Sequence, residues 1–360
     1  MLLSVIIPTR NREDVLSGLL GSLARQPAVP FEWEVLVVDN DSSDDTAERT
    51  REATSDFPVP LQYVLETELG LHAARHRGAY EANGEIVAFL DDDMLVEQGW
   101  VRGVLPIQEG RADAVMGRIL PKWLSSPPEW LYSLCHTDGD NMICGYLGIL
   151  DLGDETRPLP WHLVFGGNLF IPKQLLFRLG GFNPDSLPPD MLRFRGDGES
   201  GLMARFQQEK LASVYEPTAT VYHLIDSDRL SREYLARRAF NQGISASFTD
   251  YRSRNGLAPQ LALEPLRSRA LTGLLALPAG SALVTAARKL KRLLSPKRPL
   301  PASDVREEMD EAFRRGWLFH RREVRRDEAV RRRLLKETYL DEGRPANLHE
   351  QPMQTAGGSS

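Results

Sequence analysis

The sequence predicts an α/β fold, a doubly wound and mostly parallel sheet followed by a helical C-terminal extension. Short apolar runs rich in branched residues alternate with amphipathic helical patterns over residues 1–95. From about residue 252 the pattern is instead helical and rich in arginine. Because the chain has 360 residues, it can bury the core of one large domain and still carry an appendage.

Four apolar runs in the first part are typical of buried strands, at residues 2–7, 34–38, 61–64 and 85–90. Between them, helical patterns begin near Asn11, Thr46 and Gly70, and Asn11 is the predicted N-cap of the first helix. Since each strand is followed by a helix, we expect the strands to run parallel and to be joined by right-handed crossovers.

Polar side chains follow these strands at the points where the strands end: Thr9 and Arg10, then Asp39, then the acids Asp91–Asp93. The carboxyl ends of parallel strands meet at one edge of the sheet, where α/β proteins bind ligands. Adjacent carboxylates repel one another unless a cation neutralises them, so a buried strand that ends directly on three acids indicates a metal site. The alternative is a solvated acidic turn.

The same residues exclude several classes of protein. The loop Pro8–Arg12 has no glycine, whereas a dinucleotide-binding dehydrogenase or a P-loop kinase needs glycines there so that phosphate can approach. A net charge of −6 argues against nucleic-acid binding. The start has no secretion-signal pattern, and two cysteines without a Cys-x-x-Cys motif indicate free thiols, with a disulfide left open. We therefore expect a cytoplasmic protein.

Residues 96–251 follow a less regular pattern, and we expect antiparallel strands among irregular segments. The pair Gly166–Gly167 precedes a short strand, which indicates either the close approach of another group or an ordinary bulge. Asp197 and Glu199 begin a helix, where one such acid can be a simple cap. A hairpin-like pair of strands is expected at 214–223, and it ends on His223, a structural residue unless a metal is nearby.

Together these residues resemble the motifs of family 2 glycosyltransferases, which are inverting enzymes with the nucleotide-sugar-binding GT-A fold. The resemblance covers about residues 2–251 and rests on motifs in a fixed order. They are Ser4–Asn11, Val37–Asn40 with Ser42 and Asp45, Gly70 through Arg75 to Gly78, Phe89–Asp93, Gly166–Asn168 through Gly180–Phe182, and Gly196–Glu199. The resemblance implies a GT-A sheet with a nucleotide-binding half and an acceptor-binding half.

The resemblance also implies a role for each group of residues. The nucleotide sugar would be bound by Pro8, Thr9, Arg10, Arg12, Asp39, Asn40, Arg75, Asp91 and Asp92, and the acceptor by Gly166, Gly167 and Asn168. The metal, Mn²⁺ or Mg²⁺, would be held by Asp91, Asp93 and His223. A carboxylate such as Asp39 accepts the N3–H of uracil or thymine, so the expected donor is a UDP- or dTDP-sugar.

Asp197 falls at the position of the family's general base, which takes the proton of an attacking hydroxyl on a glycan or lipid-linked glycan. Gly196 replaces the glutamate that commonly precedes this base, and Glu199 is expected to orient the acceptor or support the base. The missing glutamate keeps open a GT-A-like binding protein without catalysis. A sugar nucleotidyltransferase is a third hypothesis, against which a first loop without glycine or lysine argues.

The predicted domains are a glycosyltransferase domain at 1–251, divided into halves at 1–95 and 96–251, a basic helical extension at 252–343 and a disordered tail at 344–360. An uncharged stretch with basic flanks, residues 267–294, predicts peripheral contact with the inner face of the cytoplasmic membrane, beside a lipid-linked acceptor. The alternative is that this stretch packs on the catalytic domain or on a second subunit of a homodimer.

Overall fold

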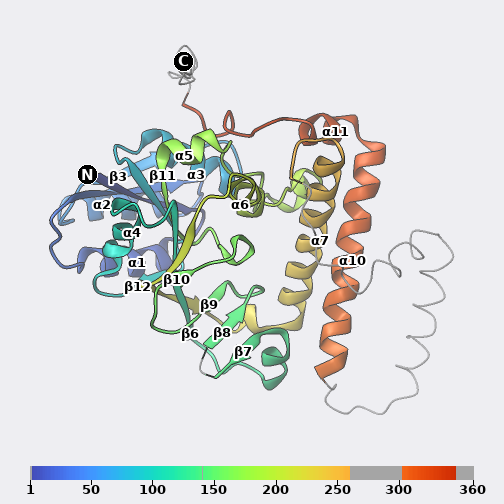
Figure 1. Ribbon diagram of the computed structural model, residues 1–360, viewed down its shortest axis with the longest axis horizontal. Helices are drawn as coiled ribbons and strands as arrows, with labels where there is room; N and C mark the ends of the chain where they lie inside the picture. The colour runs from blue at the N-terminus through green and yellow to red at the C-terminus, as the bar shows by residue number, and fades with distance from the viewer. Residues whose placement is uncertain (1, 140, 260–301, 346–360) are drawn as a thin grey trace.

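The computed structural model describes residues 2–139, 141–259 and 302–345, and its described part is built on one twelve-stranded sheet (Figure 1). The strands are β1 (Leu2–Thr9), β2 (Glu32–Asp39), β3 (Leu61–Leu65), β4 (Ile86–Leu90), β5 (Met94–Val96), β6 (Ala114–Trp123), β7 (His136–Asp138), β8 (Asn141–Cys144), β9 (Ile149–Asp151), β10 (Arg157–Pro158), β11 (Asn168–Pro172) and β12 (Ser213–Ile225). Their order is β3-β2-β1-β4-β11-β6-β9-β8-β7, and β12 pairs with β5, β6 and β10.

The first half of this sheet is the parallel array that the sequence predicts. β1 pairs in parallel with β2 and β4, and β2 pairs in parallel with β3. The helices α1 (Glu13–Ala24), α2 (Thr46–Thr54) and α3 (Leu71–Glu81) connect these strands. Side chains such as Val5, Val37 and Phe89 are fully buried in the core. The register sets Thr9 beside Asp39, so the strand ends meet at one edge of the sheet.

The second half is mostly antiparallel, as expected. β11 joins the two halves because it pairs antiparallel with both β4 and β6. The predicted hairpin at 214–223 is wrong, since β12 is one strand that pairs in parallel with β6 on both sides of an irregularity between Glu216 and Val221. Both parts of β12 keep the same direction beside one partner, so the chain bulges there and does not turn back.

Short helices fill the connections of this half. The α-helices are α4 (Leu105–Gln108), α5 (Lys173–Arg178) and α6 (Glu199–Gln208). The 3₁₀ turns are η1 (Trp100–Val104), η2 (Glu129–Leu134), η3 (Trp161–Leu163), η4 (Pro189–Phe194) and η5 (Asp228–Leu230). Cys135 and Cys144 are both free thiols, which confirms the expectation for the cysteines.

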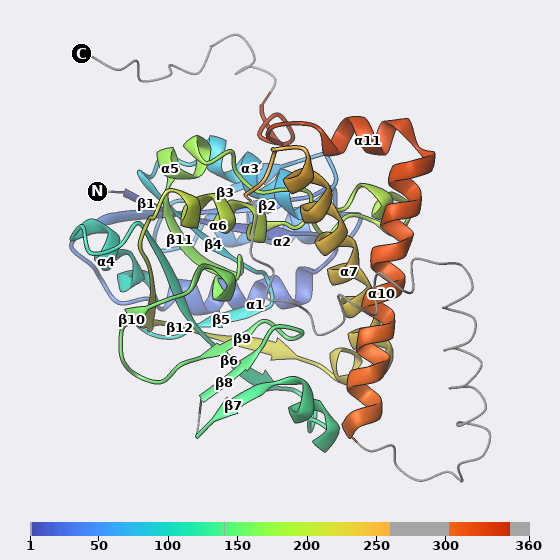
Figure 2. The ribbon, with the colours of Figure 1, turned by 45° about the vertical axis from the view of Figure 1, so that its right-hand side comes forward.

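Two long helices lie side by side next to the sheet, α7 (Arg232–Arg254) and α10 (Ala302–Arg326), and α11 (Glu328–Leu334) follows them (Figure 2). Glycines at the crossing let the backbones approach closely. A Cβ on Gly243 would lie 2.0 Å from the carbonyl oxygen of Phe313, and a Cβ on Gly316 would lie 1.8 Å from that of Phe240. The predicted domain boundary at residue 251 falls inside α7.

The segment after α11 returns to the parallel half and packs on α3. His72 Nε2 lies 2.6 Å from a carboxylate oxygen of Glu342, and His76 Nδ1 lies 3.0 Å from the Glu342 carbonyl oxygen. The hydroxyl of Tyr80 donates to the carbonyl oxygen of Leu340 at 3.0 Å. The described C-terminal segment is therefore fixed to the helix that precedes β4.

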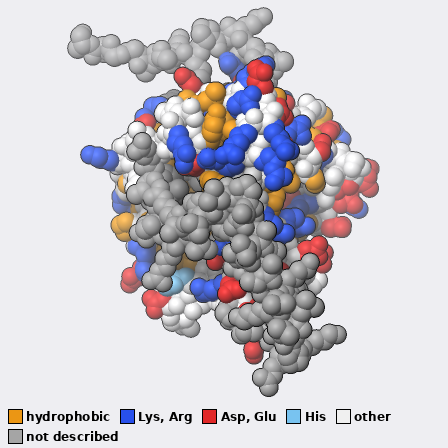
Figure 3. All heavy atoms as spheres, turned by 90° about the vertical axis from the view of Figure 1, so that its right-hand side faces the viewer, with side chains coloured by type: hydrophobic (Ala, Val, Ile, Leu, Met, Phe, Trp, Pro, Cys, Tyr) orange, Lys and Arg blue, Asp and Glu red, His pale blue; other side chains and the backbone are white. Residues whose placement is uncertain are grey.

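The surface of α10 and α11 carries exposed arginines, among them Arg322, Arg325, Arg326 and Arg332, as the basic helical pattern predicts (Figure 3). The predicted membrane contact at 267–294 and most of the predicted disordered tail lie outside the described residues. In the described ranges, no helix combines the length and the apolar character needed to span a bilayer.

Candidate active site

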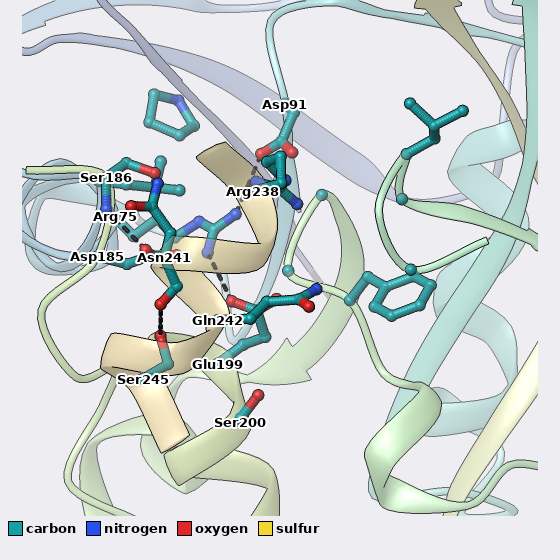
Figure 4. Close-up of a pocket in the computed structure, with 18 of the residues that line it drawn as sticks. Arg75, Asp91, Asp185, Ser186, Glu199, Ser200, Arg238, Asn241, Gln242 and Ser245 are labelled. Carbon is teal, nitrogen blue, oxygen red and sulfur yellow. Dashed lines mark hydrogen bonds and ion pairs between the residues drawn. The ribbon is translucent and has the colours of Figure 1, made fainter. Parts of the chain in front are cut away.

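A cleft of about 800 Å³ opens where β1 and β4 end (Figure 4). Its other walls include side chains from α6 and α7 and the segments 145–148 and 161–167. The predicted site residues that line it are Pro8, Thr9, Arg10, Arg12, Asn40, Arg75, Asp91, Asp92, Asp93, Gly166, Gly167, Asp197, Glu199 and His223. Asp39 and Asn168 do not line it. The structure thus brings together motifs that are far apart in the chain.

Each of the three acids after β4 has an arginine partner. Arg75 Nη2 donates to Asp91 Oδ1 at 3.0 Å. Arg12 Nη1 donates to Asp92 Oδ1 at 3.1 Å and to Asp93 Oδ2 at 2.8 Å. Burial raises the pKa of Asp92 to about 7, and the charge of Arg12 opposes this effect. The guanidinium groups therefore neutralise a cluster that would otherwise repel itself.

Gly166 and Gly167 make room for this cluster. The carbonyl oxygen of Gly167 accepts from the backbone N–H of Asp91 at 3.2 Å, which brings the two segments together. A Cβ on Gly166 would lie 2.4 Å from Nη1 of Arg75, and a Cβ on Gly167 would lie 2.4 Å from Oδ2 of Asp91. The pair therefore permits the close approach that its sequence indicated, and the approaching groups are the side chains of an ion pair.

Asp93 and His223 lie together on the other side of the cluster. Nδ1 of His223 lies 2.8 Å from the carbonyl oxygen of Leu147, an acceptor, so Nδ1 carries the proton and Nε2 keeps a lone pair. This Nε2 is 3.5 Å from Asp93 Oδ1. Although burial opposes it, the charges of Arg229 and Arg12 lower the pKa of Asp93.

Arg229 is a member of this cluster that the sequence did not indicate. Its Nη1 donates to His223 Nε2 at 2.5 Å, and its Nη2 forms an ion pair with Asp93. A single arginine in a polar segment has no distinctive pattern, and only the path of the chain from β12 into η5 places it here. Among the residues that the structure describes, no group of three or more His, Cys, Asp or Glu side chains is arranged to hold a metal.

Asp197 and Glu199 both line the cleft, but their surroundings differ. Asp197 accepts a hydrogen bond on each oxygen, from Asn183 Nδ2 and from Thr249 Oγ1, both at 2.6 Å. Glu199 has an ion pair with Arg75 Nη1 at 3.9 Å (Figure 4). Burial raises the pKa of both carboxyls. The two hydrogen bonds oppose this rise at Asp197, and the charge of Arg75 is the main effect that opposes it at Glu199.

Side-chain hydrogen bonds hold the loops of the nucleotide half in place. Asn11 does not cap α1, because its φ of 53° turns it away and its Oδ1 accepts from the Ser43 N–H at 2.7 Å. Asp39 is buried and accepts from the Tyr63 hydroxyl at 2.8 Å. The Asn40 amide donates to the carbonyl oxygens of Glu66 and Glu68. Nucleobase binding by Asp39 stays a prediction, since each carboxylate oxygen can accept a further bond.

Asn168 is predicted to bind the acceptor, but it does not line the cleft. Its side chain is fully buried, and the next three residues of β11 are buried with it. Trp100 Nε1 donates to Asn168 Oδ1 at 2.9 Å, and Asn168 Nδ2 donates to the carbonyl oxygen of Ala219 at 2.8 Å. Asn168 therefore joins β11 to neighbouring elements.

The fold is the GT-A fold of glycosyltransferases. It is similar to that of the mannosyltransferase PcManGT from Pyrobaculum calidifontis in complex with GDP-Man and Mn²⁺, with a TM-score of 0.50 and 20% identity over 95% of this chain and 85% of that one. Residues 4–152 match the family model of glycosyl transferase family 2. This match over the N-terminal part of the chain confirms the resemblance seen in the motifs.

Two named relatives show how far the similarity extends. Validoxylamine A glucosyltransferase of Streptomyces hygroscopicus subsp. limoneus is 32% identical over 202 residues, which cover 51% of this chain and 44% of the relative. Glucosyl-dolichyl phosphate glucuronosyltransferase of Haloferax volcanii is 23% identical over 261 residues, which cover 69% of this chain and 78% of that protein. The chain therefore spans less than half the length of the first relative.

Proposed function

We propose that the protein is a metal-dependent inverting glycosyltransferase that moves a sugar from a UDP- or dTDP-sugar to a hydroxyl of a glycan or lipid-linked glycan. One observation carries this proposal. Arg75 connects Asp91, at the ends of the parallel strands, with Glu199, at 3.0 Å and 3.9 Å, inside one cleft. A donor-binding acid and a carboxylate able to take a proton thus face the same space.

The general base in this proposal is Glu199, and Asp197 has a structural role through its hydrogen bonds with Asn183 and Thr249. A base needs an oxygen that is free to reach the acceptor hydroxyl. Asp197 is buried and both its oxygens are held by Asn183 and Thr249, whereas Glu199 is more exposed and its ion pair with Arg75 is long. The assignment of Asp197 as base, predicted from the motif, is the competing assignment.

The chemical step balances as a single displacement. The acceptor hydroxyl gives its proton to the Glu199 carboxylate while its oxygen forms a bond to C1 of the sugar. The bond between C1 and the diphosphate oxygen breaks, and the diphosphate leaves with the electron pair. Because attack comes from the face opposite the leaving group, the configuration at C1 is inverted.

The residues at Asp93 and His223 suit a divalent metal. A carboxylate oxygen and an imidazole Nε2 whose ring is oriented by the Leu147 carbonyl are metal ligands, and Mg²⁺ commonly takes one or two protein carboxylates together with substrate phosphates. When bound, the metal would neutralise the charge of the departing diphosphate. Arg229 contacts both ligand atoms and would have to move aside, and Asp91 would have to leave Arg75 to join them.

The relatives support the substrate classes of the proposal. Their names describe transfer of glucose or glucuronic acid, and one of them names a dolichyl phosphate acceptor. An acceptor of this kind would place the protein at the inner face of the cytoplasmic membrane. Residues 1–95 and 96–251 then serve as donor and acceptor halves, and 252–343 as an extension.

The experiment that tests the function is a panel of UDP-, dTDP- and GDP-sugars, with release of the nucleoside diphosphate measured in Mn²⁺, in Mg²⁺ and with a chelator. We expect release from a UDP- or dTDP-sugar that the chelator abolishes. Binding of these donors without release under any condition would support the non-catalytic alternative. Release that is unchanged by the chelator would contradict the metal assignment.

A further inference from the structure

The charges that line the cleft are not fully paired. Six arginines line it: Arg10, Arg12, Arg75, Arg195, Arg229 and Arg238. Four of them form ion pairs with acids of the same cleft, among them Arg195 with Asp185. In the described ranges, Arg10 and Arg238 have no carboxylate partner.

The two unpaired arginines differ in their surroundings. Arg10 is exposed in the loop after β1, where water solvates its charge. Arg238 is half-buried on α7, and its Nε has neither solvent contact nor a hydrogen-bond partner. Oδ1 of Asn241 is buried without a partner in the same way. Nε of Arg75 and Nε of Arg195 also lack a partner, but the other nitrogens of those two groups pair with acids. Arg238 combines the unpartnered Nε with the absence of a carboxylate partner in the described ranges, which indicates a place for a ligand.

The spacing along α7 explains why these groups act together. Asn241 and Gln242 follow Arg238 by three and four positions, which places both on the face of the helix that carries Arg238. In Figure 4 these side chains project from α7 into the cavity that also contains Asp91 and Glu199. The face therefore presents a guanidinium and two amides to any molecule that occupies the cleft beside Glu199.

We propose that Arg238, with Asn241 and Gln242, forms a subsite for an oxyanion of the acceptor, a phosphate or a carboxylate. A guanidinium offers a planar pair of N–H donors that matches two oxygens of such a group. A half-buried cation without a counterion favours an anionic ligand over a neutral one. The role of the subsite rests on the proposed function, since the acceptor is the substrate expected next to Glu199.

The donor is a second source of the same chemistry, because its diphosphate is also an oxyanion. Arg12 and the Asp93–His223 pair lie at the ends of β1 and β4 and are the groups expected near that diphosphate. Arg238 comes from α7, a different wall of the cleft. The two sources can be separated by filling the donor side before the anion is added.

The test uses the full chain, saturated with UDP and Mg²⁺ and titrated with inorganic phosphate as the probe, with binding followed by ³¹P NMR. We expect Arg238→Met to weaken phosphate binding by about tenfold or more and to leave UDP affinity unchanged. The matched control is Arg237→Met, which removes the same charge from an exposed neighbour that does not line the cleft. Arg238→Lys should bind phosphate at an intermediate strength.

Three results would overturn the subsite. The first is that phosphate does not bind to the UDP-saturated protein, and the second is that Arg238→Met and the native protein bind phosphate with equal affinity. The third is that Arg238→Met loses UDP affinity, which would assign the arginine to the donor. None of these measurements needs turnover. If no donor in the panel released its nucleoside diphosphate, the proposed function would fail while the phosphate-binding result would still stand or fall on its own.

Discussion

Glu199 and Asp197 are close in sequence, and their hydrogen bonds separate their roles. We predict that Glu199→Gln lowers turnover by at least about 10²-fold while donor affinity is kept, because the amide keeps the size of the side chain and cannot take a proton. In the native protein, turnover should fall as the pH is lowered through the raised pKa of Glu199, since only the ionised carboxylate is a base. Rates of nucleoside diphosphate release across pH measure both effects.

The matched variant is Asp197→Asn. Its amide nitrogen cannot accept from Asn183 or Thr249, so we expect a loss of unfolding free energy of about 1–3 kcal/mol with turnover largely retained. Thermal unfolding and initial rates of the same preparations measure the two properties. If Asp197→Asn loses turnover and Glu199→Gln does not, the base is Asp197.

Arg229 holds the two atoms that a divalent metal would use. We predict that Arg229→Ala binds Mn²⁺ about tenfold more tightly in the absence of nucleotide, because the metal no longer competes with the guanidinium for Asp93 and His223. The EPR signal of free Mn²⁺ measures this affinity, and Arg237→Ala is the control. An affinity equal to that of the native protein would show that Arg229 does not compete.

At this scale the sequence predicts the acids and not their partners. Asp91–Asp93 stand out because a buried strand runs directly into them, and Glu199 and Asp197 because glycines flank them. Arg229 and Arg238 are isolated charges in polar segments. The contact of Thr249 with Asp197 depends on how α7 packs against the segment that precedes α6, which no local pattern encodes.

Among the elements, the crossing of α7 and α10 depends on two glycines. We predict that Gly316→Ala lowers the free energy of unfolding by at least about 1–3 kcal/mol, because the added Cβ would meet the Phe240 carbonyl oxygen at 1.8 Å and force the helices apart. Gly21→Ala within α1 is the control, since its Cβ would meet its nearest neighbour at 3.5 Å. This control should gain up to about 1 kcal/mol in helix propensity. Equal stability of both variants would contradict the tight crossing.

The strands show which elements a sequence can predict. β1, β2 and β4 are found because their apolar runs are buried over almost their whole length and are bounded by polar loops, whereas β3, at the edge of the sheet, is only partly buried. The sequence pattern divides β12 into two strands, because Pro217 interrupts the apolar pattern as a turn residue would. Its continuity is set by its partner β6, which pairs with both parts. Strand pairing between distant segments is therefore the information that local patterns lack.

For the molecule as a whole, the contact of the C-terminal segment with α3 links the end of the described chain to the parallel half of the sheet. Phe182 N–H donates to His76 Nε2 at 2.9 Å, so His76 is neutral, and burial lowers its pKa to about 3. The unfolded chain, in which histidine titrates near 6.5, binds a proton that the folded chain does not take up between these pH values. Stability should therefore fall as the pH is lowered below about 6.5.

Denaturant unfolding at several pH values between 7 and 4.5 measures this dependence. Glu342 adds to the loss at lower pH, because its pKa is lowered by its bond to His72 against the effect of burial. His76→Gln should show a weaker pH dependence than the native protein, by up to one bound proton. A pH dependence that is the same in both would separate His76 from the acid response.

The stereochemistry of donor hydrolysis tests the central claim most directly, because it needs no knowledge of the acceptor. With water in place of the acceptor, time-resolved proton NMR of the sugar released from an α-linked nucleotide sugar reports the first anomer formed. A single displacement with Glu199 as base predicts the β-anomer, formed by the native protein and lost in Glu199→Gln. Initial release of the α-anomer would contradict it.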